Sequence, residues 1–451
     1  MKYKAYPEYK DSGVEWFGEI PIHWNVAALR RSLLDHKQGY YTTDDYVEDG
    51  VKIVRITDLR DYGDVDFSNC PRVPSENFNL INFELNNGDV IFARTGGAGS
   101  FGVIKGLQER VVFASYLIRF RFYESNFIND YLKYMLIADS FQKAIKQNIH
   151  GGVNQNIHAD DIKGAFLARS PLDEQIKIAN FLDHETAKID TLIEKQQQLI
   201  QLLKEKRQAV ISHAVTKGLN PDVPMRDSGV EWLGYVPEHW RIAGFKKYLN
   251  PIVDYRGKTP EKKDTGIFLI TARNIKNGKI NYDLSQEYIA ESDYENVMSR
   301  GKPKIGDIIF TTEAPLGEVA SVDREDIALA QRIIKFDGQS GVLNNEFLKY
   351  LIMSSQFQQS LMMFASGSTA LGIKAERLVY LRALIPPIDE QMEIVKYIEV
   401  LIDRVDNLIT KAEMAIGIMQ ERRTALISAA VTGKIDVRNW QPPKTNTSEA
   451  A

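Results

Sequence analysis

The chain has 451 residues, of which 44% are hydrophobic and 26% are charged, a composition typical of folded globular proteins and a length sufficient for two or three domains. The formal net charge of -4 excludes a protein that coats nucleic acid through an overall excess of Lys and Arg, so any binding to DNA must depend on local surfaces. The single cysteine, Cys70, excludes a disulfide framework and a cysteine-rich zinc site, and with no apolar run long enough for a membrane span or a targeting segment it predicts a cytoplasmic protein.

The first conspicuous segment is an aromatic motif that occurs twice, 216 positions apart. Entrance motif 1 runs from Asp11-Ser12-Gly13-Val14-Glu15-Trp16-Phe17-Gly18 to Pro21, His23 and Trp24, and entrance motif 2 runs from Asp227-Ser228-Gly229-Val230-Glu231-Trp232-Leu233-Gly234 to Pro237, His239 and Trp240. Trp residues beside Gly and Pro predict a turn that docks the start of a lobe against a larger element. The alternative is an aromatic platform on which bases stack. Neither His has a partner at metal-ligand spacing, so we predict a structural role for both.

Each entrance motif leads into a lobe of predicted α+β structure. In the first lobe, residues 51–59, 88–94 and 111–123 have the composition of strands, and residues 129–147 have helical spacing. The second lobe repeats this order more loosely, with a strand at 306–312 and helical spacing at 344–364. The predicted scaffold is therefore shared, while most polar positions differ between the lobes.

A long heptad seam follows each lobe. Its positions are Leu182, Thr186, Ile189, Ile193, Gln196, Ile200, Leu203, Arg207, Val210 and Ala214, and the same seam returns 216 positions later from Ile398 to Ala430. Asp-Glu-Gln precedes both seams, at 173–175 and 389–391, after the proline breaks at 171 and 386–387. A helix of about 35 residues is about 50 Å long, too long for the core of a small domain. We predict a first lobe at 1–170, a helical spacer at 171–220, a second lobe at 221–385, a second spacer at 386–438 and a disordered tail at 439–451.

Two glycine-rich segments suggest nucleotide binding but do not fit it. Residues 97–102 match G-x-G-x-x-G, yet a β-like segment follows where the fingerprint requires a helix. Residues 257–259 resemble the end of a P-loop, but Ile252 stands where its first glycine belongs and Pro260 obstructs the required helix. We find no catalytic constellation in the sequence and no metal-ligand cluster.

Polar residues in loops at matched places of the two lobes are the best candidates for a function. Arg, Asn and Gln side chains can contact base edges in pairs of hydrogen bonds, which favours DNA as the ligand over ordinary solvated loops. The candidates are Arg55, Arg60, Arg94, Thr95, Asn154 and Gln155 in the first lobe, and Arg256, Lys258, Thr259, Arg273, Lys276, Thr311, Thr312, Ser368 and Thr369 in the second.

The two entrance motifs and the two Asp-Glu-Gln helices, each pair at one constant offset, resemble the specificity subunit of type I restriction-modification systems. The resemblance covers about residues 11–436. It implies two similar target recognition lobes, each reading one half of an asymmetric, bipartite site in double-stranded DNA. It also implies that the two long helices pack as an antiparallel coiled coil with internal pseudo-two-fold symmetry and set the spacing between the half-sites.

The same resemblance implies a non-catalytic chain that binds two modification (methyltransferase) subunits and, beyond them, restriction subunits that translocate and cut DNA. S-adenosylmethionine, ATP and magnesium are then expected only on those partners, and no cofactor is expected on this chain. Two other classes stay open on the residues alone. A coiled-coil scaffold would lack salt-dependent DNA binding, and a self-sufficient nuclease or methyltransferase would be active without partners.

Overall fold

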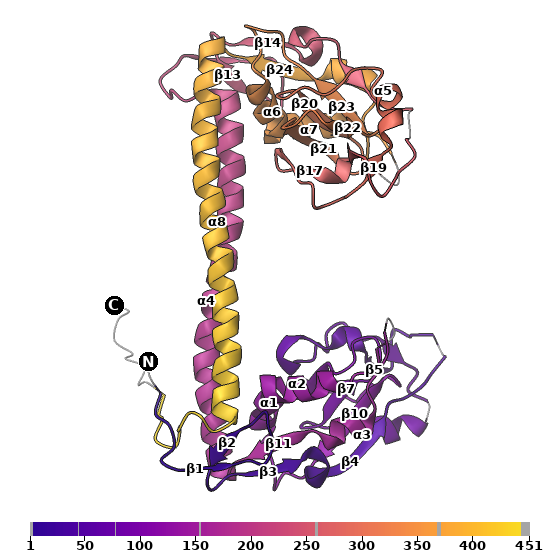
Figure 1. The fold of residues 1–451 in the computed structure, drawn as a ribbon, viewed down its shortest axis with the longest axis vertical. Helices are drawn as coiled ribbons and strands as arrows, with labels where there is room; N and C mark the ends of the chain where they lie inside the picture. Colours follow the sequence, from indigo (N-terminus) through magenta and orange to yellow (C-terminus); the bar gives the residue numbers. More distant parts are fainter. Residues whose placement is uncertain are drawn as a thin grey trace. The chain divides into compact units, whose positions relative to one another are not determined.

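The computed structural model describes residues 3–43, 45–76, 78–152, 155–257, 260–367 and 371–442. The chain forms two compact units, unit 1 (Met1–Gln196 and Met414–Ala451) and unit 2 (Gln197–Glu413). Each unit combines one lobe with a segment of each long helix, α4 (Leu172–Lys217) and α8 (Ile388–Val431), and Figure 1 shows the two helices side by side. The predicted fold class, two similar lobes of strands and short helices with two long helices, is confirmed.

The lobe of unit 1 is built on a four-stranded antiparallel sheet in the order β4-β10-β7-β8. A three-stranded sheet, β6-β5-β9, lies in the same lobe, and its β5 and β9 are parallel. The strands are β1 (Tyr9–Asp11), β2 (Glu19–Pro21), β3 (Asn25–Ala28), β4 (Leu33–Gln38), β5 (Val51–Val54), β6 (Arg72–Val73), β7 (Val90–Ala93), β8 (Phe101–Val103), β9 (Val111–Phe113), β10 (Leu117–Phe122) and β11 (Phe166–Arg169). The helices are α1 (Asn129–Ile137), α2 (Asp139–Gln147) and α3 (Ala159–Gly164).

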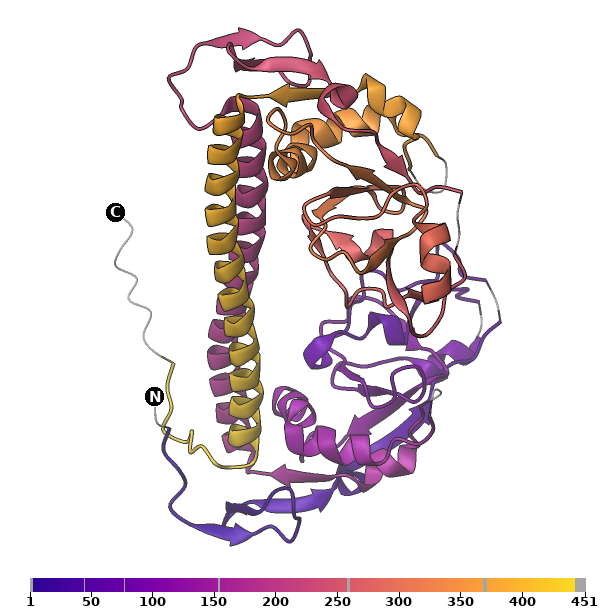
Figure 2. The same cartoon turned by 45° about the horizontal axis from the view of Figure 1, so that its top comes forward.

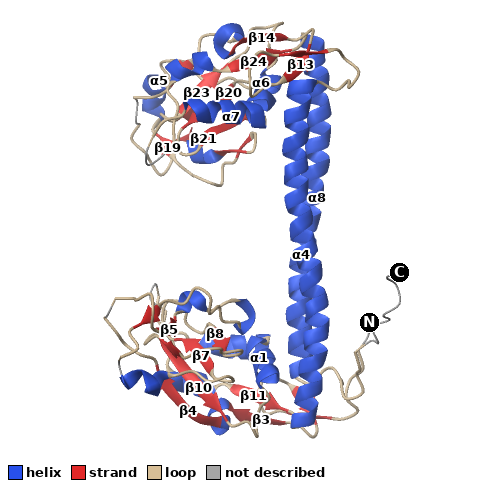
Figure 3. Cartoon of the chain, turned by 180° about the vertical axis from the view of Figure 1, so that it is seen from behind, coloured by secondary structure: helices blue, strands red, loops and turns tan. Residues whose placement is uncertain are grey.

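The lobe of unit 2 repeats this topology with sheets in the orders β15-β23-β20-β21 and β19-β16-β22, and Figure 3 shows strands with short helices in both lobes. Its strands are β12 (Met225–Asp227), β13 (Tyr235–Pro237), β14 (Arg241–Gly244), β15 (Val253–Asp254), β16 (Ile267–Ile270), β17 (Ile275–Lys276), β18 (Lys279–Ile280), β19 (Tyr288–Ile289), β20 (Ile308–Thr312), β21 (Leu316–Ser321), β22 (Ile327–Leu329), β23 (Ile333–Phe336) and β24 (Arg382–Ile385). Its helices are α5 (Tyr294–Val297), α6 (Asn345–Met353) and α7 (Ser355–Phe364).

Figure 2 also shows α4 and α8 side by side, and burial of the predicted heptad seam indicates that they pack through it. All ten seam positions of each helix are buried or partly buried, which confirms the seam. Both helices begin earlier than the seam does, directly after the prolines, because residues such as Ile178 and Phe181 are buried in the core that α4 shares with the lobe of unit 1. Within the described ranges, no helix is both long and apolar enough to cross a membrane.

Entrance motif 1 docks on the first turn of α4 through the carboxylate of Glu174. Its Oε2 lies 2.9 Å from Nε2 of His23, and its Oε1 accepts hydrogen bonds from Nε1 of Trp24 at 3.2 Å and from the hydroxyl of Tyr6. Glu174 is 2% exposed, and these three donors offset the free-energy cost of burying its carboxylate. The two duplicated motifs of the sequence thus meet in space.

Entrance motif 2 forms the same joint at the start of α8. Glu390 Oε2 lies 2.8 Å from Nε2 of His239, and Oε1 accepts a hydrogen bond from Nε1 of Trp240 at 3.0 Å. Trp24 and Trp240 are 0% and 1% exposed. The predicted docking role is confirmed, and base stacking by these two rings is wrong because neither face is accessible.

The remaining parts of the duplicated helix motifs also bind the lobes. Gln175 donates to the carbonyl oxygens of Asn126 and Ser170 at 3.0 and 2.9 Å, and Gln391 repeats both bonds in unit 2 at 2.8 Å. At the other end of each helix, Ser428 Oγ accepts from the backbone nitrogen that opens α2 at 3.0 Å, and Ser212 Oγ does the same for α7 at 2.9 Å. Each lobe is therefore anchored to both helices at its base.

The chain is ordered beyond residue 439, where we predicted that a disordered tail begins. Trp440 packs edge-on against Phe181, with ring centroids 5.5 Å apart, and Asp436 donates its backbone N–H to the carbonyl of Lys4. The apolar ring finds a site on α4, which the sequence pattern of a polar tail did not predict. Residues 443–451 lie outside the described part of the chain.

Candidate nucleic-acid interface

The two lobes carry a matched pair of loops at the ends of their central strands. Residues 150 and 156 pair through both backbone hydrogen bonds, at 2.9 and 2.8 Å, and residues 366 and 372 do so at 2.9 and 3.0 Å. Loop 150–156 forms a bridge with Thr95 after β7, and loop 366–372 forms one with Glu313 after β20. The backbone thus brings the predicted loop and the predicted strand end together in each lobe. Asn154, Ser368 and Thr369, which belong to these loops, lie outside the described residues.

Arg94 and Thr95 stand at this strand end in unit 1. The backbone of Arg94 is held on both sides, because its N–H donates to Tyr116 O at 2.9 Å and its carbonyl accepts from Ile157 at 3.0 Å. Its side chain is partly exposed, and Thr95 is exposed. A fixed backbone with an accessible guanidinium is suited to reading a base edge.

Arg55 lies near the same strand end, within electrostatic range of Tyr116 and Tyr46. Its Nε and terminal nitrogen donate to Asp58 at 3.2 and 3.0 Å, and this hydrogen bonding raises the pKa of Arg55. Asp58 also accepts from the backbone N–H of Arg55 and closes a short helical turn. Arg55 is thus oriented by the turn, with 30% of its side chain exposed.

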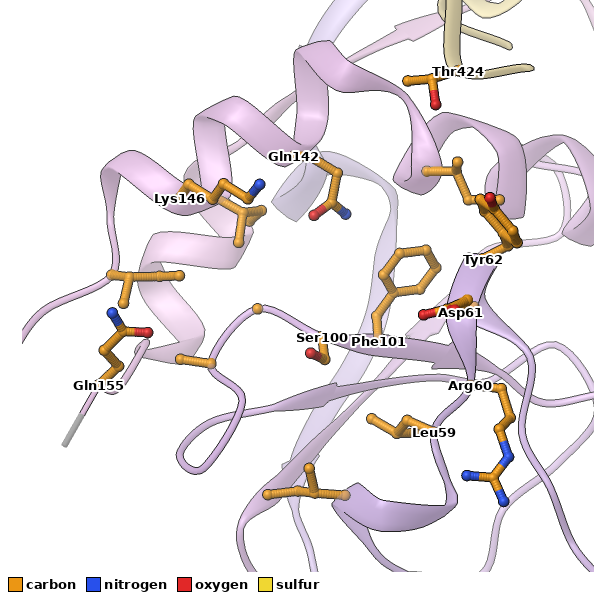
Figure 4. Close-up of a pocket in the computed structure, with 17 residues that line it drawn as sticks. Leu59, Arg60, Asp61, Tyr62, Ser100, Phe101, Gln142, Lys146, Gln155 and Thr424 are labelled. Atoms are coloured by element: carbon orange, nitrogen blue, oxygen red, sulfur yellow. The ribbon is translucent and has the colours of Figure 1, made fainter. Parts of the chain in front are cut away.

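Arg60 and Gln155 line a pocket of about 720 Å³ in unit 1. Figure 4 shows Gln155 and Lys146 on one side of this pocket and Arg60 on the other, with Ser100 between them. Arg60 donates to Asp66 at 2.6 Å, and hydrogen bonds from Ser68 and Arg60 lower the pKa of Asp66. The pocket therefore combines apolar side chains with two cations, Arg60 and Lys146, one carboxylate, Asp61, and polar groups such as Gln155.

In unit 2, Arg256 lies in a second pocket, of about 800 Å³, together with Arg300 and Lys374. Arg256 Nε and its terminal nitrogen donate to Asp254 at 2.9 and 2.5 Å. Burial alone would raise the pKa of Asp254, but hydrogen bonds from Arg256 outweigh burial and lower this pKa. Arg300 donates to the carbonyl oxygens of Asp254 and Arg256 at 2.5 and 2.6 Å, which stiffens this loop. Three cations against two carboxylates, Asp254 and Glu376, leave a basic hollow.

Arg273 and Lys276 are exposed on a different segment of unit 2, the turn after β16. This turn matches the one that carries Arg55 and Arg60 in unit 1, at the constant offset of 216. The capping contact is also matched, since Thr271 and Asn274 occupy the places of Arg55 and Asp58. Lys258 and Thr259, predicted beside Arg256, fall outside the described residues.

Two predicted contacts, Thr311 and Thr312, are wrong. Thr311 is 0% exposed, and its hydroxyl accepts from the backbone N–H of Glu318 at 2.9 Å. Thr312 is 2% exposed, and its hydroxyl donates to the carbonyl of Arg332 at 3.2 Å. Both hydroxyls complete the hydrogen bonding of a strand, so neither is free to meet DNA.

Arg332 is the residue that sequence reasoning missed at this place. It occupies the position of Tyr116, since Thr312 N–H donates to Arg332 O as Arg94 N–H donates to Tyr116 O. Its side chain is 48% exposed and lies 2.9 Å from Glu313. The constant offset of 216 gives the same match, but Tyr116 was not itself a candidate and so did not point to Arg332. Over the described ranges, no group of three or more His, Cys, Asp or Glu is arranged to hold a metal ion.

Comparisons with known proteins bear on both lobes. The family model described as type I restriction modification DNA specificity domain matches residues 47–202 and again 250–415. The type I restriction enzyme MjaVIII specificity subunit of Methanocaldococcus jannaschii is 24% identical over 414 residues, which cover 89% of this chain and 88% of the relative. The EcoKI specificity subunit of Escherichia coli K12 is 21% identical and covers 94% and 91%.

Solved structures show the same fold at low sequence identity. A chain from a structural study of complex assembly and conformational transition in the type I R-M system aligns with a TM-score of 0.70 and 14% identity, over 92% of this chain and 99% of that one. The HsdS subunit of Thermoanaerobacter tengcongensis aligns with a TM-score of 0.51 and 13% identity, over 92% and 98%.

Proposed function

This chain belongs to the type I restriction-modification DNA specificity family and contains the family's domain twice. We propose that it is the sequence-recognition subunit of a type I restriction-modification complex. Each lobe reads one half of a bipartite, asymmetric site in double-stranded DNA. The observation that carries this proposal is the matched strand end and loop of the two lobes, with the same backbone contacts and different side chains. Two lobes that bind DNA in the same way but prefer different sequences would share these backbone contacts and differ in these side chains.

The reading surface in each lobe rests on side chains whose backbone is fixed by neighbouring strands. In unit 1 it comprises Arg94, Thr95 and Arg55, with Arg60 and Gln155 lining the adjoining pocket. In unit 2 it comprises Arg256 and Arg332, with Arg273 and Lys276 on the turn matched to Arg55 and Arg60. These cations give local attraction to phosphate and donors for base edges, in a chain whose net charge is -4.

The helices supply a surface for protein partners. Large apolar side chains are exposed at matched positions of the two helices, 216 residues apart: Ile176 with Met392, Leu192 with Leu408, and Leu202 with Ile418, each between 46% and 63% exposed. Exposed apolar residues in repeated positions favour docking of two copies of one partner. We assign this surface to two modification subunits, with restriction subunits bound to them.

The chemistry belongs to those partners in this proposal. This chain orients DNA and does not itself transfer a methyl group or cut a strand. S-adenosylmethionine, ATP and magnesium are bound by the modification and restriction subunits, and we place the whole complex in the cytoplasm. Turnover by the highly purified chain alone, with S-adenosylmethionine or with ATP and magnesium, would contradict this division.

The test is a map of methylated adenines made by the chain assembled with its modification subunits on unmethylated genomic DNA. We expect one motif, consisting of two specific half-sites separated by a gap of fixed length. Omission of this chain should abolish methylation at that motif. Methylation at a single continuous motif, or at the same sites without this chain, would refute the proposal.

A further inference from the structure

Each lobe presents a tight turn that contacts the long helices at a distance from its base. In unit 1 the turn contains Tyr62 and Gly63, with φ of 61° and 78°, and in unit 2 it contains Asn277 and Gly278, with φ of 55° and 82°. Positive φ at both central residues is typical of a type I′ turn, for which Asn-Gly is a favoured sequence. A bulky residue such as Tyr62 rarely adopts this conformation, so its surroundings must hold it there.

The apolar seam of the helices is interrupted by an arginine at matched positions, Arg423 in α8 and Arg207 in α4. Arg423 Nε and its terminal nitrogen donate to the two carboxylate oxygens of Asp190 in α4 at 2.8 and 3.3 Å. Arg207 donates to Asp406 in α8 at 3.2 Å. The two aspartates are also 216 positions apart, so one ion pair between the helices occurs in each unit.

Each arginine of these pairs also contacts the turn of its lobe. The guanidinium carbon of Arg423 lies 3.7 Å from the centre of the Tyr62 ring, and Arg423 is 6% exposed. One of its terminal nitrogens has no hydrogen-bond partner within the described residues, so the ring is the main neighbour of that side of the cation. In unit 2, Arg207 donates to the carbonyl of Asn277 at 3.3 Å, and Lys279 from the same hairpin lies 3.3 Å from Asp406.

A charged residue in a helical seam requires an explanation, because apolar residues of similar volume generally pack there with equal or greater stability. A polar seam residue can fix the register of two helices. Register alone, however, would need only the pair with aspartate. In both units the arginine reaches beyond that pair to the tip of a lobe turn, and this second contact points to the placement of the lobe.

The positions of the contacts along the helix suggest what the pair controls. Asp190 lies 16 residues beyond Glu174, the anchor of the lobe's base, which corresponds to about 24 Å along the helix axis. A tilt of about 8° about the base would move the turn away from the helices by about 3.4 Å. It would move a part of the lobe that lies about 24 Å out from the helices by the same distance along their axis, which is the rise of one DNA base pair. A small change in tilt is therefore sufficient to move a lobe from one base-pair register to the next.

We propose that Arg423 and Arg207 are positioning residues, each of which locks the tilt of one lobe on the helices so that the complex accepts a single spacer length between half-sites. This inference rests on the function proposed above. It assigns spacer selectivity to a contact between lobe and helix, in addition to the length of the helices.

The experiment uses the chain assembled with its modification subunits and DNA substrates that keep both half-sites but have the native spacer, one base pair fewer or one more. The variants are Arg423→Met and Arg207→Met, which refill the seam with an apolar side chain. We expect the preference for the native spacer to fall about five- to ten-fold in each, a coupling on the scale of a single regulatory contact. Half-site sequence preference should not change. Arg404→Met, at an exposed position of α8, is the matched control and should keep the full spacer preference.

Hydrogen exchange gives the second readout. Arg423→Met should speed exchange at residues 60–64, and Arg207→Met at residues 275–280, while the amides of the adjoining helix segments stay protected. Tyr62→Asn is a further variant, since Asn tolerates positive φ and leaves the ion pair with Asp190 intact. It should also relax the spacer preference. Arg423→Lys keeps a charge but not the planar stacking group, so this variant should retain only part of the native spacer preference.

The outcomes separate this inference from the proposed function. Bipartite methylation by the native chain with unchanged spacer preference in both Met variants would overturn the positioning role and leave the function standing. An equal loss of methylation on all three spacers would also overturn it, because that result indicates a general loss of affinity. Absence of bipartite methylation by the native complex would instead refute the proposed function.

Discussion

The joint between each entrance motif and its helix leads to a sharp prediction, because the same substitution should have different costs in the two units. Glu174→Ala would leave Trp24 and Tyr6, which are 0% and 4% exposed, with donors facing no acceptor. Each buried unpaired donor costs about 1–3 kcal/mol, so we expect the two donors together to cost about 2–6 kcal/mol in unit 1. Burial, followed by the hydrogen bond to Glu174, raises the pKa of Tyr6 well above its usual range, so its hydroxyl stays a donor at all ordinary pH values.

The joint in unit 2 is weaker for two structural reasons. The side chain of Glu390 is 26% exposed, compared with 3% for Glu174, so water can replace the lost carboxylate. The place of Tyr6 is taken by Asp222, which is exposed, so only Trp240 loses a buried partner. Glu390→Ala should therefore cost about 1–2 kcal/mol.

Hydrogen exchange followed by mass spectrometry is the appropriate assay, because a chain of two units does not unfold in one two-state step. The free energy of opening is measured for the amides of α1 in unit 1 and of α6 in unit 2. Glu174→Ala should lower the value at α1 by about 2–6 kcal/mol, and Glu390→Ala should lower the value at α6 by about 1–2 kcal/mol. Glu174→Gln, which retains an acceptor oxygen, is the control and should cost less than Glu174→Ala. Equal losses in the two units, or a larger loss in unit 2, would refute this reasoning.

Three further predictions follow from the site and the helices. Arg94→Ala and Arg332→Ala should each weaken binding by about 1–3 kcal/mol and relax one position of a different half-site, as measured by binding to a library of altered sites; unchanged affinity and specificity would move the reading surface elsewhere. Burial, followed by the nearby charge of Asp58, raises the pKa of the Cys70 thiol to about 12. This thiol should therefore react slowly with a disulfide reagent at pH 8, and a native reaction as fast as that of an unfolded control would contradict this burial. The stability that the protonated thiol contributes below pH 9 should be lost as pH rises from about 9, the pKa in the unfolded chain, toward 12. Four helix-forming residues inserted near residue 198 of α4 and residue 415 of α8 add about 6 Å and 40° of rotation, so the preferred spacer should lengthen by one or two base pairs; an unchanged spacer in a folded, assembled variant would show that the helices do not set it.

The sequence predicts those parts of the fold that repeat at a fixed offset. Trp24 and Trp240, the Asp-Glu-Gln segments and the seam positions were all found in this way, because apolar periodicity and duplicated motifs reflect packing directly. The offset also identifies Arg207 and Arg423 as equivalent seam positions. It does not reveal that each contacts a lobe turn, since that contact depends on tertiary structure.

The recognition surface was less predictable because exposure at a strand end depends on which neighbour covers it. Thr311 and Thr312 occupy the places of Ala93 and Arg94, yet their hydroxyls turn inward to Glu318 and Arg332. Arg332 had no sequence signal of its own. It lies 216 positions after Tyr116, and the matched backbone hydrogen bonds confirm this equivalence, but no side-chain pattern shows that this position stands beside the strand end.

The central claim is that each lobe is an independent reader of one half-site. The most direct measurement replaces residues 25–168 by the equivalent lobe of a relative with a different specificity and maps methylated adenines after assembly with the modification subunits. Glu174, Gln175 and Ser428 lie outside the exchanged segment, so the helix side of the anchors at its base is kept. The account predicts that one half-site changes to that of the relative while the other half-site and the spacer stay the same. A change in both half-sites, or in neither, would contradict it.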